Sequence, residues 1–158
     1  MIRLLRVDHR LLHGQVVFTW AKTTGSDCIL IANDSVVKDE IRKSMLKLSK
    51  PEGGKLVFKS IADSVKAINE GKTDKYKLLI LVDNLADAEK LALSCPAVTS
   101  VNLGGLKQRA GTRALGPAFY VTEEECAMLR NMIRNGVEAE VRQVPTDSKV
   151  VVNEQMIK

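Results

Sequence analysis

The sequence is poor in aromatic residues, cysteine and histidine, and these shortages exclude several kinds of site. Only one Trp, two Tyr and three Phe occur in 158 residues, and no Lys/Arg block is interleaved with aromatic rings. Proteins that bind single-stranded nucleic acid usually need such rings for stacking. The three cysteines, Cys28, Cys95 and Cys126, lie far apart and form no CxxC pair. With only two histidines to join them, we expect no zinc site or other bound metal.

Long apolar runs and nucleotide-binding glycine motifs are also absent. The N-terminal run Ile2–Val7 is too short for a signal peptide, and no stretch approaches the roughly 18 apolar residues of a membrane span. We therefore expect a cytoplasmic protein that meets a membrane only through its partners. Gly53-Gly54-Lys55 lacks the frame of a phosphate loop, and Gly104-Gly105 does not extend to the dinucleotide motif GxGxxG.

Short apolar segments alternate with helical patterns along the whole chain. No linker or repeat divides residues 1–158, a length that suits one domain with a sizeable core. Segments that are apolar on both faces are typical of buried parallel strands. We predict a single α/β domain with an open, mostly parallel sheet of about seven strands and helices on both faces. The expected strands are Ile2–Val7, Cys28–Ala32, Lys55–Phe58, Leu78–Val82, Val98–Leu103, Ala118–Val121 and Glu138–Val141.

Helices are expected between these strands, and the first is predicted at Gly14–Lys22. Apolar residues recur at helical spacing in the other helices, and we expect each such stripe to be core. In the second helix the stripe is Val37, Ile41, Met45 and Leu48. The expected N-caps of the second to fifth helices are Asp34, Ser60, Asn84 and Thr122, the last within a Thr122–Glu125 capping box.

Two regions lack a clear helical pattern. The segment Gly104–Gly116 carries Lys107, Arg109 and Arg113 among glycines and alanines, and we expect it near the carboxyl edge of the sheet because it follows a strand. These three cations either belong to a solvated loop or form a binding patch. Near the end of the chain, Val150–Val152 is expected to add an edge strand or a packed tail.

The segment Asp8–Val16 carries the most specific chemistry. It places His13 and Gly14 where a strand ends and a helix begins, which is where open α/β sheets bind ligands. The amides of a helix N-terminus favour an anion, so those of Gly14, Gln15 and Val16 would point at a bound phosphoryl group. A neutral imidazole accepts a phosphoryl group near pH 7. His13 is therefore the candidate nucleophile.

Each neighbouring side chain has a functional and a plainer interpretation. Arg10 is a clamp for phosphoryl oxygens or a surface partner of Asp8. Asp8 orients an imidazole nitrogen or Arg10, or it caps the turn through a backbone amide. His13 itself could merely cap the helix. We expect the adjacent His9 to point away from the site, and the pairs Asn33-Asp34 and Asp83-Asn84 to cap helices rather than hold magnesium.

The net charge of +5 and the pI near 9.2 fit an acidic partner, a phosphorylated substrate or nucleic acid, without choosing among them. A small nucleotide- or RNA-binding module without catalytic chemistry therefore stays open as an alternative at this point.

Asp8-His9-Arg10-Leu11-Leu12-His13-Gly14-Gln15-Val16 closely resembles the motif D-x-R-L-[IL]-H-G-Q-V. That motif belongs to the IIB component of the mannose/fructose/sorbose family of the bacterial sugar phosphotransferase system (PTS). The resemblance covers the full chain, and further matching segments are Trp20, Ile31–Asp34, Pro51–Lys55, Val101–Gly105 and Tyr120–Glu125. His9 falls at a variable position of the motif.

The resemblance implies a phosphotransferase that acts as a phosphocarrier and needs no metal or cofactor. His13 would accept a phosphoryl group from a phosphohistidine of a IIA component, as a pros-phosphohistidine linked through Nδ1, and pass it to a sugar imported by the membrane components IIC and IID. Arg10 maps onto the phosphoryl-binding arginine and Asp8 onto the acidic residue of the motif. Arg109 in the basic loop is a further candidate for phosphate or partner contacts. A regulatory phosphoacceptor stays open as an alternative, as do the sugar and the oligomeric state, a homodimer included.

Overall fold

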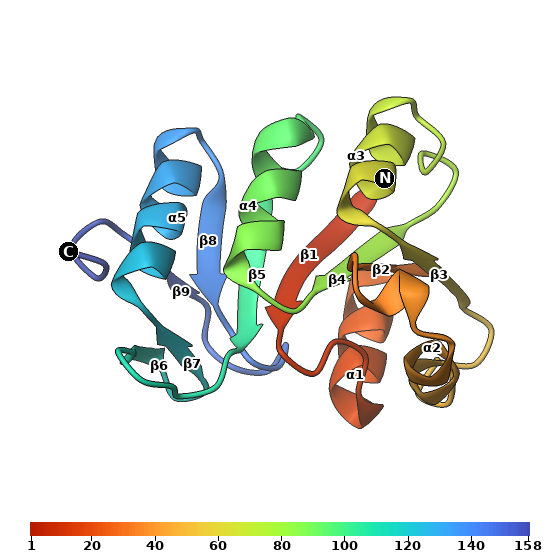
Figure 1. Ribbon diagram of the computed structural model, residues 1–158, viewed down its shortest axis with the longest axis horizontal. Coiled ribbons are helices and arrows are strands. Elements are labelled where there is room, and N and C mark those ends of the chain that lie inside the picture. The colour runs from red at the N-terminus through yellow and green to blue at the C-terminus, as the bar shows by residue number, and fades with distance from the viewer.

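Figure 1 shows a computed structural model that describes all 158 residues, with most strands side by side in one twisted sheet. The strands are β1 (Ile2–Asp8), β2 (Cys28–Ala32), β3 (Lys55–Lys59), β4 (Leu78–Val82), β5 (Ser100–Gly105), β6 (Arg113–Gly116), β7 (Phe119–Val121), β8 (Glu138–Val141) and β9 (Val150–Val151). The helices are α1 (Gly14–Thr24), α2 (Glu40–Lys47), α3 (Ile61–Asn69), α4 (Leu85–Ser94) and α5 (Glu123–Arg134), with a short 3₁₀ turn at Val36–Lys38.

The main sheet has the strand order β3-β2-β4-β1-β5-β8-β9. Every neighbouring pair is parallel except β8 and β9. The two strands β2 and β4 are buried along their whole length, as apolar strands covered on both faces should be. The predicted open, mostly parallel sheet of seven strands is confirmed, and so is the edge strand near Val150.

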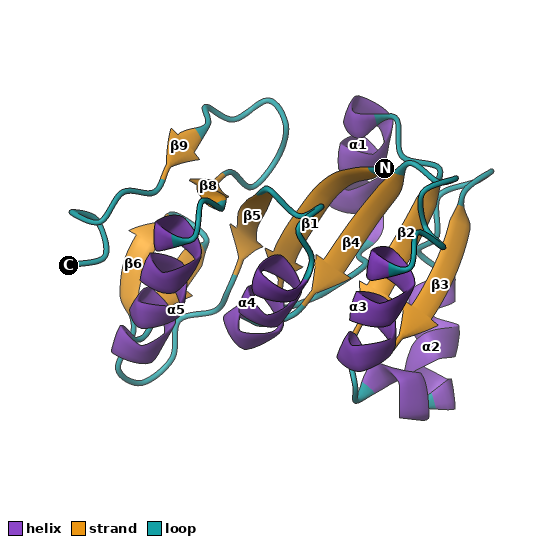
Figure 2. Cartoon of the chain, turned by 90° about the horizontal axis from the view of Figure 1, so that it is seen from above, coloured by secondary structure: helices purple, strands orange, loops and turns teal.

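Helices cover both faces of the sheet, as predicted. Figure 2 shows α1 on one face and α3, α4 and α5 in a row on the other. Side chains of β1 alternate between these layers: Leu5 and Val7 join the larger core under α3 to α5, whereas Leu4 packs with Val17 and Trp20 of α1. None of the helices combines the length and the apolar character needed to cross a membrane.

One predicted strand of the sheet lies elsewhere. The segment predicted at Ala118–Val121 is a strand, β7, but it pairs antiparallel with β6 in a separate two-stranded sheet. The chain turns back on itself between Arg113 and Val121, so that Phe119 is buried against the main core. The region Gly104–Gly116, which has no helical pattern, therefore contains the end of β5 and the first strand of a hairpin.

The expected N-cap of the second helix was wrong. Asn33, not Asp34, accepts the amides of Ser35 and Val36, at 3.0 Å each. The helix itself begins later, where Asp39 accepts the amide of Arg42. Asp34 instead accepts the amide of Ile61 at the start of α3, a contact between residues 27 positions apart that local spacing does not reveal.

The apolar residues of the second helix that were expected to lie in the core are also largely exposed. Ile41, Met45 and Leu48 are 77%, 65% and 88% exposed, and Leu46 is the residue of α2 that packs inward. The extra 3₁₀ turn delays the start of the helix, and α2 lies at the β3 end of the sheet (Figures 1 and 2). The other expected caps, Ser60, Asn84 and the Thr122 capping box, are confirmed.

Candidate functional site

The loop between β1 and α1 turns sharply so that His13 comes back over Asp8. The amide of Leu11 donates to the carbonyl of Asp8 at 2.9 Å, and Leu11 is buried with a φ of +58°, a conformation that costs a non-glycine residue free energy. Gly14 follows with a φ of +42°. His13 occupies the N-cap position of α1, but its side chain makes no capping hydrogen bond. Capping therefore does not account for the imidazole.

Four basic side chains surround the fully buried carboxylate of Asp8. Oδ1 accepts the backbone amide of Arg10 at 3.0 Å and its Nε at 3.4 Å. Oδ2 accepts Nη2 of Arg6 at 3.1 Å. Nε2 of His13 lies 3.7 Å from Oδ2, and Nδ1 of His9 lies 3.8 Å from Oδ1. Asp8 thus caps the turn, as the plainer interpretation has it, and also faces the imidazole and Arg10, so a role in orienting them stays a prediction.

The expectation that His9 points away from the site was wrong. Its ring faces the same carboxylate as His13, and its Nδ1 is buried without a hydrogen bond. The backbone amide of His9 donates to the carbonyl of Gly105 at 3.0 Å. This hydrogen bond holds the backbone of the loop against the end of β5.

The surroundings of His13 favour a neutral imidazole. Burial lowers its pKa from the ordinary 6.5, and the positive charge of Arg10 lowers it further, while Asp8 acts in the opposite direction. Its Nε2 is buried and directed at Asp8, which leaves Nδ1 as the nitrogen open to solvent. A hydrogen on Nε2, facing the carboxylate, would leave the lone pair on Nδ1.

Groups that could hold an anion lie close to His13 in the same loop and at the start of α1. The side chain of Arg10 is 45% exposed, and it contacts Asp8 through Nε only, so both Nη atoms are free. The surface pair with Asp8 therefore does not use up the guanidinium. Helix α1 begins at Gly14, so its first amides, which include those of Gln15 and Val16, have no partner within the helix.

A residue that sequence reasoning missed, Arg6, supports Asp8 from behind. It is completely buried, which is rare for arginine, and its Nη1 donates to Oδ1 of Asn102 at 2.7 Å. Its guanidinium lies 5.6 Å from the ring centroid of Trp20. Burial lowers the pKa of Arg6, yet an arginine beside a carboxylate keeps its charge. The available signal was an arginine directly before Val7, at the end of the otherwise mostly apolar run Ile2–Val7 and two residues before Asp8.

Two glycines of β5 make room for this arrangement. The pairing of β1 with β5 shifts between Val7 and Asp8, so that Asp8 lies opposite Gly105 and Gly104 is an extra residue. A Cβ on Gly104 would lie 2.1 Å from Cζ of Arg6, whereas a Cβ on Gly105 would lie 3.4 Å from Oδ1 of Asp8. Gly104 is therefore required for the buried guanidinium to fit.

The basic loop begins at this edge of the sheet, as expected, but its two arginines have other partners. Nη2 of Arg109 bonds Oε1 of Glu125 at 2.5 Å, at the start of α5. Arg113 lies 3.8 Å from Glu123 and donates to the carbonyl of Lys158. None of the three loop cations contacts Asp8, Arg10 or His13. A role of Arg109 in phosphate binding stays a prediction.

Sequence comparisons identify relatives along the whole chain. The family model described as the PTS system sorbose subfamily IIB component matches residues 2–158. The mannose-specific EIIAB component of the PTS of Escherichia coli K12 is 33% identical over 150 residues, which are 95% of this chain and 46% of that protein. The chain thus spans about half the length of this relative. The sorbose-specific EIIB component of Lacticaseibacillus casei is 31% identical over 147 residues, covering 93% of this chain and 90% of that protein.

Solved structures have the same fold. The IIBSor domain of the sorbose permease from Klebsiella pneumoniae superimposes with a TM-score of 0.91 at 28% identity, covering 99% of this chain and 96% of that one. The N-acetylgalactosamine-specific IIB component 1 from Escherichia coli gives a TM-score of 0.89 at 25% identity, covering 97% and 100%. With a family model that matches nearly every residue and a common fold, the chain belongs to the sorbose subfamily of PTS IIB components.

Proposed function

We propose that this chain is a phosphocarrier that accepts a phosphoryl group on Nδ1 of His13 from a phosphohistidine of a IIA component. The observation that carries the proposal is the orientation of the imidazole at the N-cap of α1: Nε2 is buried against Asp8, which leaves Nδ1 as the open nitrogen. The lowered pKa of His13 keeps the nucleophile neutral at pH 7.

The chemistry needs positioning and charge stabilisation rather than a strong base. The Nδ1 lone pair attacks phosphorus while the bond from phosphorus to the donor nitrogen breaks, and the electron pair stays on the donor imidazole. The His13 ring gains positive charge in this step, and the buried carboxylate of Asp8 stabilises it. Arg10 and the first amides of α1 neutralise the phosphoryl oxygens in transit.

In the second half of the cycle, a sugar brought by IIC and IID components would take the phosphoryl group from His13. The sugar hydroxyl oxygen attacks phosphorus, the bond to Nδ1 breaks, and the hydroxyl proton passes to solvent. We place this exchange at the cytoplasmic face of the membrane, where the chain would be held by its partners. Relatives carry mannose, sorbose and N-acetylgalactosamine in their names, so these sugars are the first candidates to test.

The direct test is phosphoryl transfer from a phosphorylated IIA domain. We expect acid-labile, base-stable phosphate on the wild type, no label on His13→Gln, and retained label on His9→Gln, the neighbouring histidine. Phosphorus NMR should show the phosphoramidate on Nδ1. Undiminished label on His13→Gln would contradict the proposal.

A second experiment separates sugar transport from a regulatory role. Membranes that contain cognate IIC and IID components should phosphorylate sugar when the labelled chain is added. Label that stays on His13 in the presence of such membranes and every candidate sugar would instead indicate a regulatory phosphoacceptor.

A further inference from the structure

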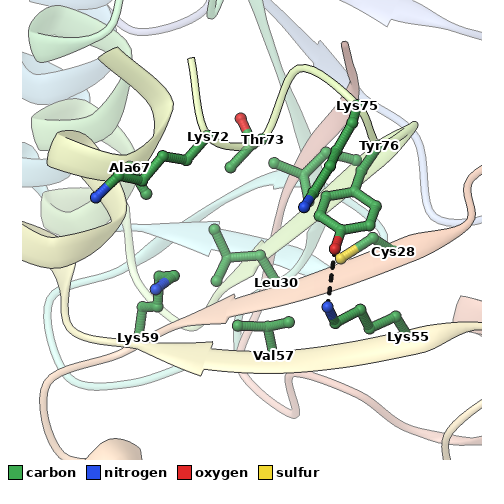
Figure 3. Close-up of a pocket in the computed structure, with 11 residues that line it drawn as sticks. Cys28, Leu30, Lys55, Val57, Lys59, Ala67, Lys72, Thr73, Lys75 and Tyr76 are labelled. Carbon is green, nitrogen blue, oxygen red and sulfur yellow. Dashed lines mark hydrogen bonds between the residues drawn. The ribbon is translucent and has the colours of Figure 1, made fainter. Parts of the chain in front are cut away.

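A lysine-rimmed hollow of about 220 Å³ lies on the sheet face that carries α3, at the outer edge of β3 (Figure 3). Its floor consists of apolar side chains from three neighbouring strands, among them Leu30, Val57 and Leu78, with the buried Cys28 beside them. Ala67 of α3 and the segment 72–76 form the wall.

The register of β3 explains why this part of the sheet combines lysines with an open apolar floor. Lys55, Val57 and Lys59 alternate along the strand and therefore point to the same face. Because β3 is the outermost strand, a helix covers this face on one side only. The floor is left accessible between two lysines of the same strand.

The charge in the hollow is of one sign. Four lysines, Lys55, Lys59, Lys72 and Lys75, line it, and no Asp or Glu does. Only Lys72 has a carboxylate partner, Glu70 at 3.3 Å. Lys55 donates to the hydroxyl of Tyr76 at 2.8 Å, and Lys75 lies 5.2 Å from the centroid of that ring.

The lysines stand in two groups with apolar side chains between them. Figure 3 shows the amines of Lys59 and Lys72 on one side, those of Lys55 and Lys75 near Tyr76 on the other, and Leu30 and Val57 in between. Like charges around a concave, low-dielectric surface concentrate a positive potential that attracts an anion.

We propose that this hollow binds a small organic dianion whose two anionic groups are joined by a short apolar chain. Each anionic group would meet one pair of lysines, and the chain would cover the apolar floor. The volume lies below the roughly 300–1,000 Å³ of ordinary ligand pockets, which limits the ligand to a few carbon atoms between its anionic groups.

The hollow is separate from the His13 site. It lies along β3, the outermost strand, which β2 and β4 separate from β1 and Asp8. The hollow also opens on the α3 face, whereas α1 covers the opposite one (Figure 2). Binding here therefore does not depend on the phosphocarrier proposal.

The test is an amide NMR titration of the full chain with linear α,ω-dicarboxylates of increasing length, from succinate to suberate. Hexanoate and inorganic phosphate serve as probes that lack the second anionic group or the apolar chain. We expect one dicarboxylate length to bind roughly five- to tenfold tighter than hexanoate or phosphate, with shifts confined to residues 55–59 and 72–76. Equal affinity for dicarboxylate and hexanoate would overturn the proposal.

Matched variants separate a built site from general attraction by a basic protein. Lys59→Gln and Lys75→Gln should each weaken the preferred dicarboxylate roughly fivefold, whereas Lys66→Gln, on an exposed lysine of α3 outside the hollow, should leave the affinity unchanged. Equal losses in Lys59→Gln and Lys66→Gln would show that net charge alone is responsible. All three variants should accept phosphoryl groups on His13 at the wild-type rate.

Discussion

At the scale of single residues, several cations share one buried carboxylate. Asp8 makes hydrogen bonds with two arginines, while the two histidines stay just beyond hydrogen-bond distance. The attraction of Asp8 for protonated His13 is therefore outweighed by burial and by Arg10, and the pKa of His13 falls. The arginines thus favour the neutral imidazole, because they repel a proton on His13 and occupy the carboxylate that would otherwise attract it.

This balance predicts how the pKa of His13 responds to substitution. By NMR titration, wild-type His13 should have a pKa below 6.5. Arg10→Gln should raise this pKa, because a repelling charge is removed. Asp8→Asn should lower it below the wild-type value, because an attracting charge is removed. A His13 pKa that falls in Arg10→Gln would contradict the assignment of causes.

The same shift links stability to pH. Because the folded pKa of His13 lies below the unfolded 6.5, the unfolded chain binds more protons between these two values. This contribution to stability is complete above pH 6.5 and is lost as the pH falls through the folded pKa. Urea unfolding of wild type and His13→Gln at pH 7.5 and 5 should therefore show a smaller acid loss in the variant.

Gly104 gives a second prediction at this scale. Gly104→Ala places a methyl group on the guanidinium of Arg6, whose hydrogen bonds to Asp8 and Asn102 prevent an easy retreat. We expect a loss of about 1–3 kcal/mol in the free energy of unfolding, together with slower phosphoryl acceptance. Gly105→Ala, whose new Cβ meets an ordinary van der Waals contact, is the matched control, and equal losses in both variants would argue against a specific role of Gly104.

Local spacing predicted part of the site and could not predict the rest. Asp8, Arg10 and His13 lie within one turn, so a strand end followed by a helix start brings them together. Arg6 depends on Asn102, 96 positions away, and on the absence of a side chain at Gly104. Such partners become visible only when β1 and β5 are paired.

At the scale of elements, strands were easier to predict than the helix at the sheet edge. The bounds of β2 and β4 match the predictions, because central strands must be apolar on both faces and are delimited by polar residues. The bounds of β8 also match, although this strand alternates between Glu and apolar residues. The apolar spacing of α2 indicates a helix but not which face is buried, since the first turn and the neighbours of the helix decide that. In the hairpin, β7 was predicted as a strand, but β6 is too short for a periodic signal, so its antiparallel pairing was missed.

The orientation of α2 predicts opposite outcomes for two leucines two positions apart. Leu46→Ala should cost about 2–5 kcal/mol of unfolding free energy, because Leu46 is 8% exposed in the core beside α1. Leu48→Ala, at an 88% exposed position, should change it by no more than about 0.5 kcal/mol. Urea denaturation of both variants measures the difference, and a larger loss at Leu48 would mean that the opposite face of α2 is buried.

At the scale of the whole molecule, residues near the end of the chain complete the larger core. Val152 and Ile157 are buried, and Arg130 of α5 donates to the carbonyl of Ile157 at 2.8 Å. Ile157→Ala should therefore lower the free energy of unfolding by about 2–5 kcal/mol, although chain ends are usually tolerant of change. Lys158→Ala is the control, and a thermal melt that is the same for both variants would show that the tail is not part of the core.

The placement of the only tryptophan means that the chain contains its own optical probe. The guanidinium groups of Arg6 and Arg142 lie 5.6 and 5.7 Å from the centroid of the Trp20 ring, and Nε1 of Trp20 donates to the carbonyl of Gln143. Arg6 in turn holds the carboxylate that faces His13. Each phosphoryl group that arrives at His13 would change the charge around one fluorophore, so turnover could be followed in real time by intrinsic emission, with no label attached.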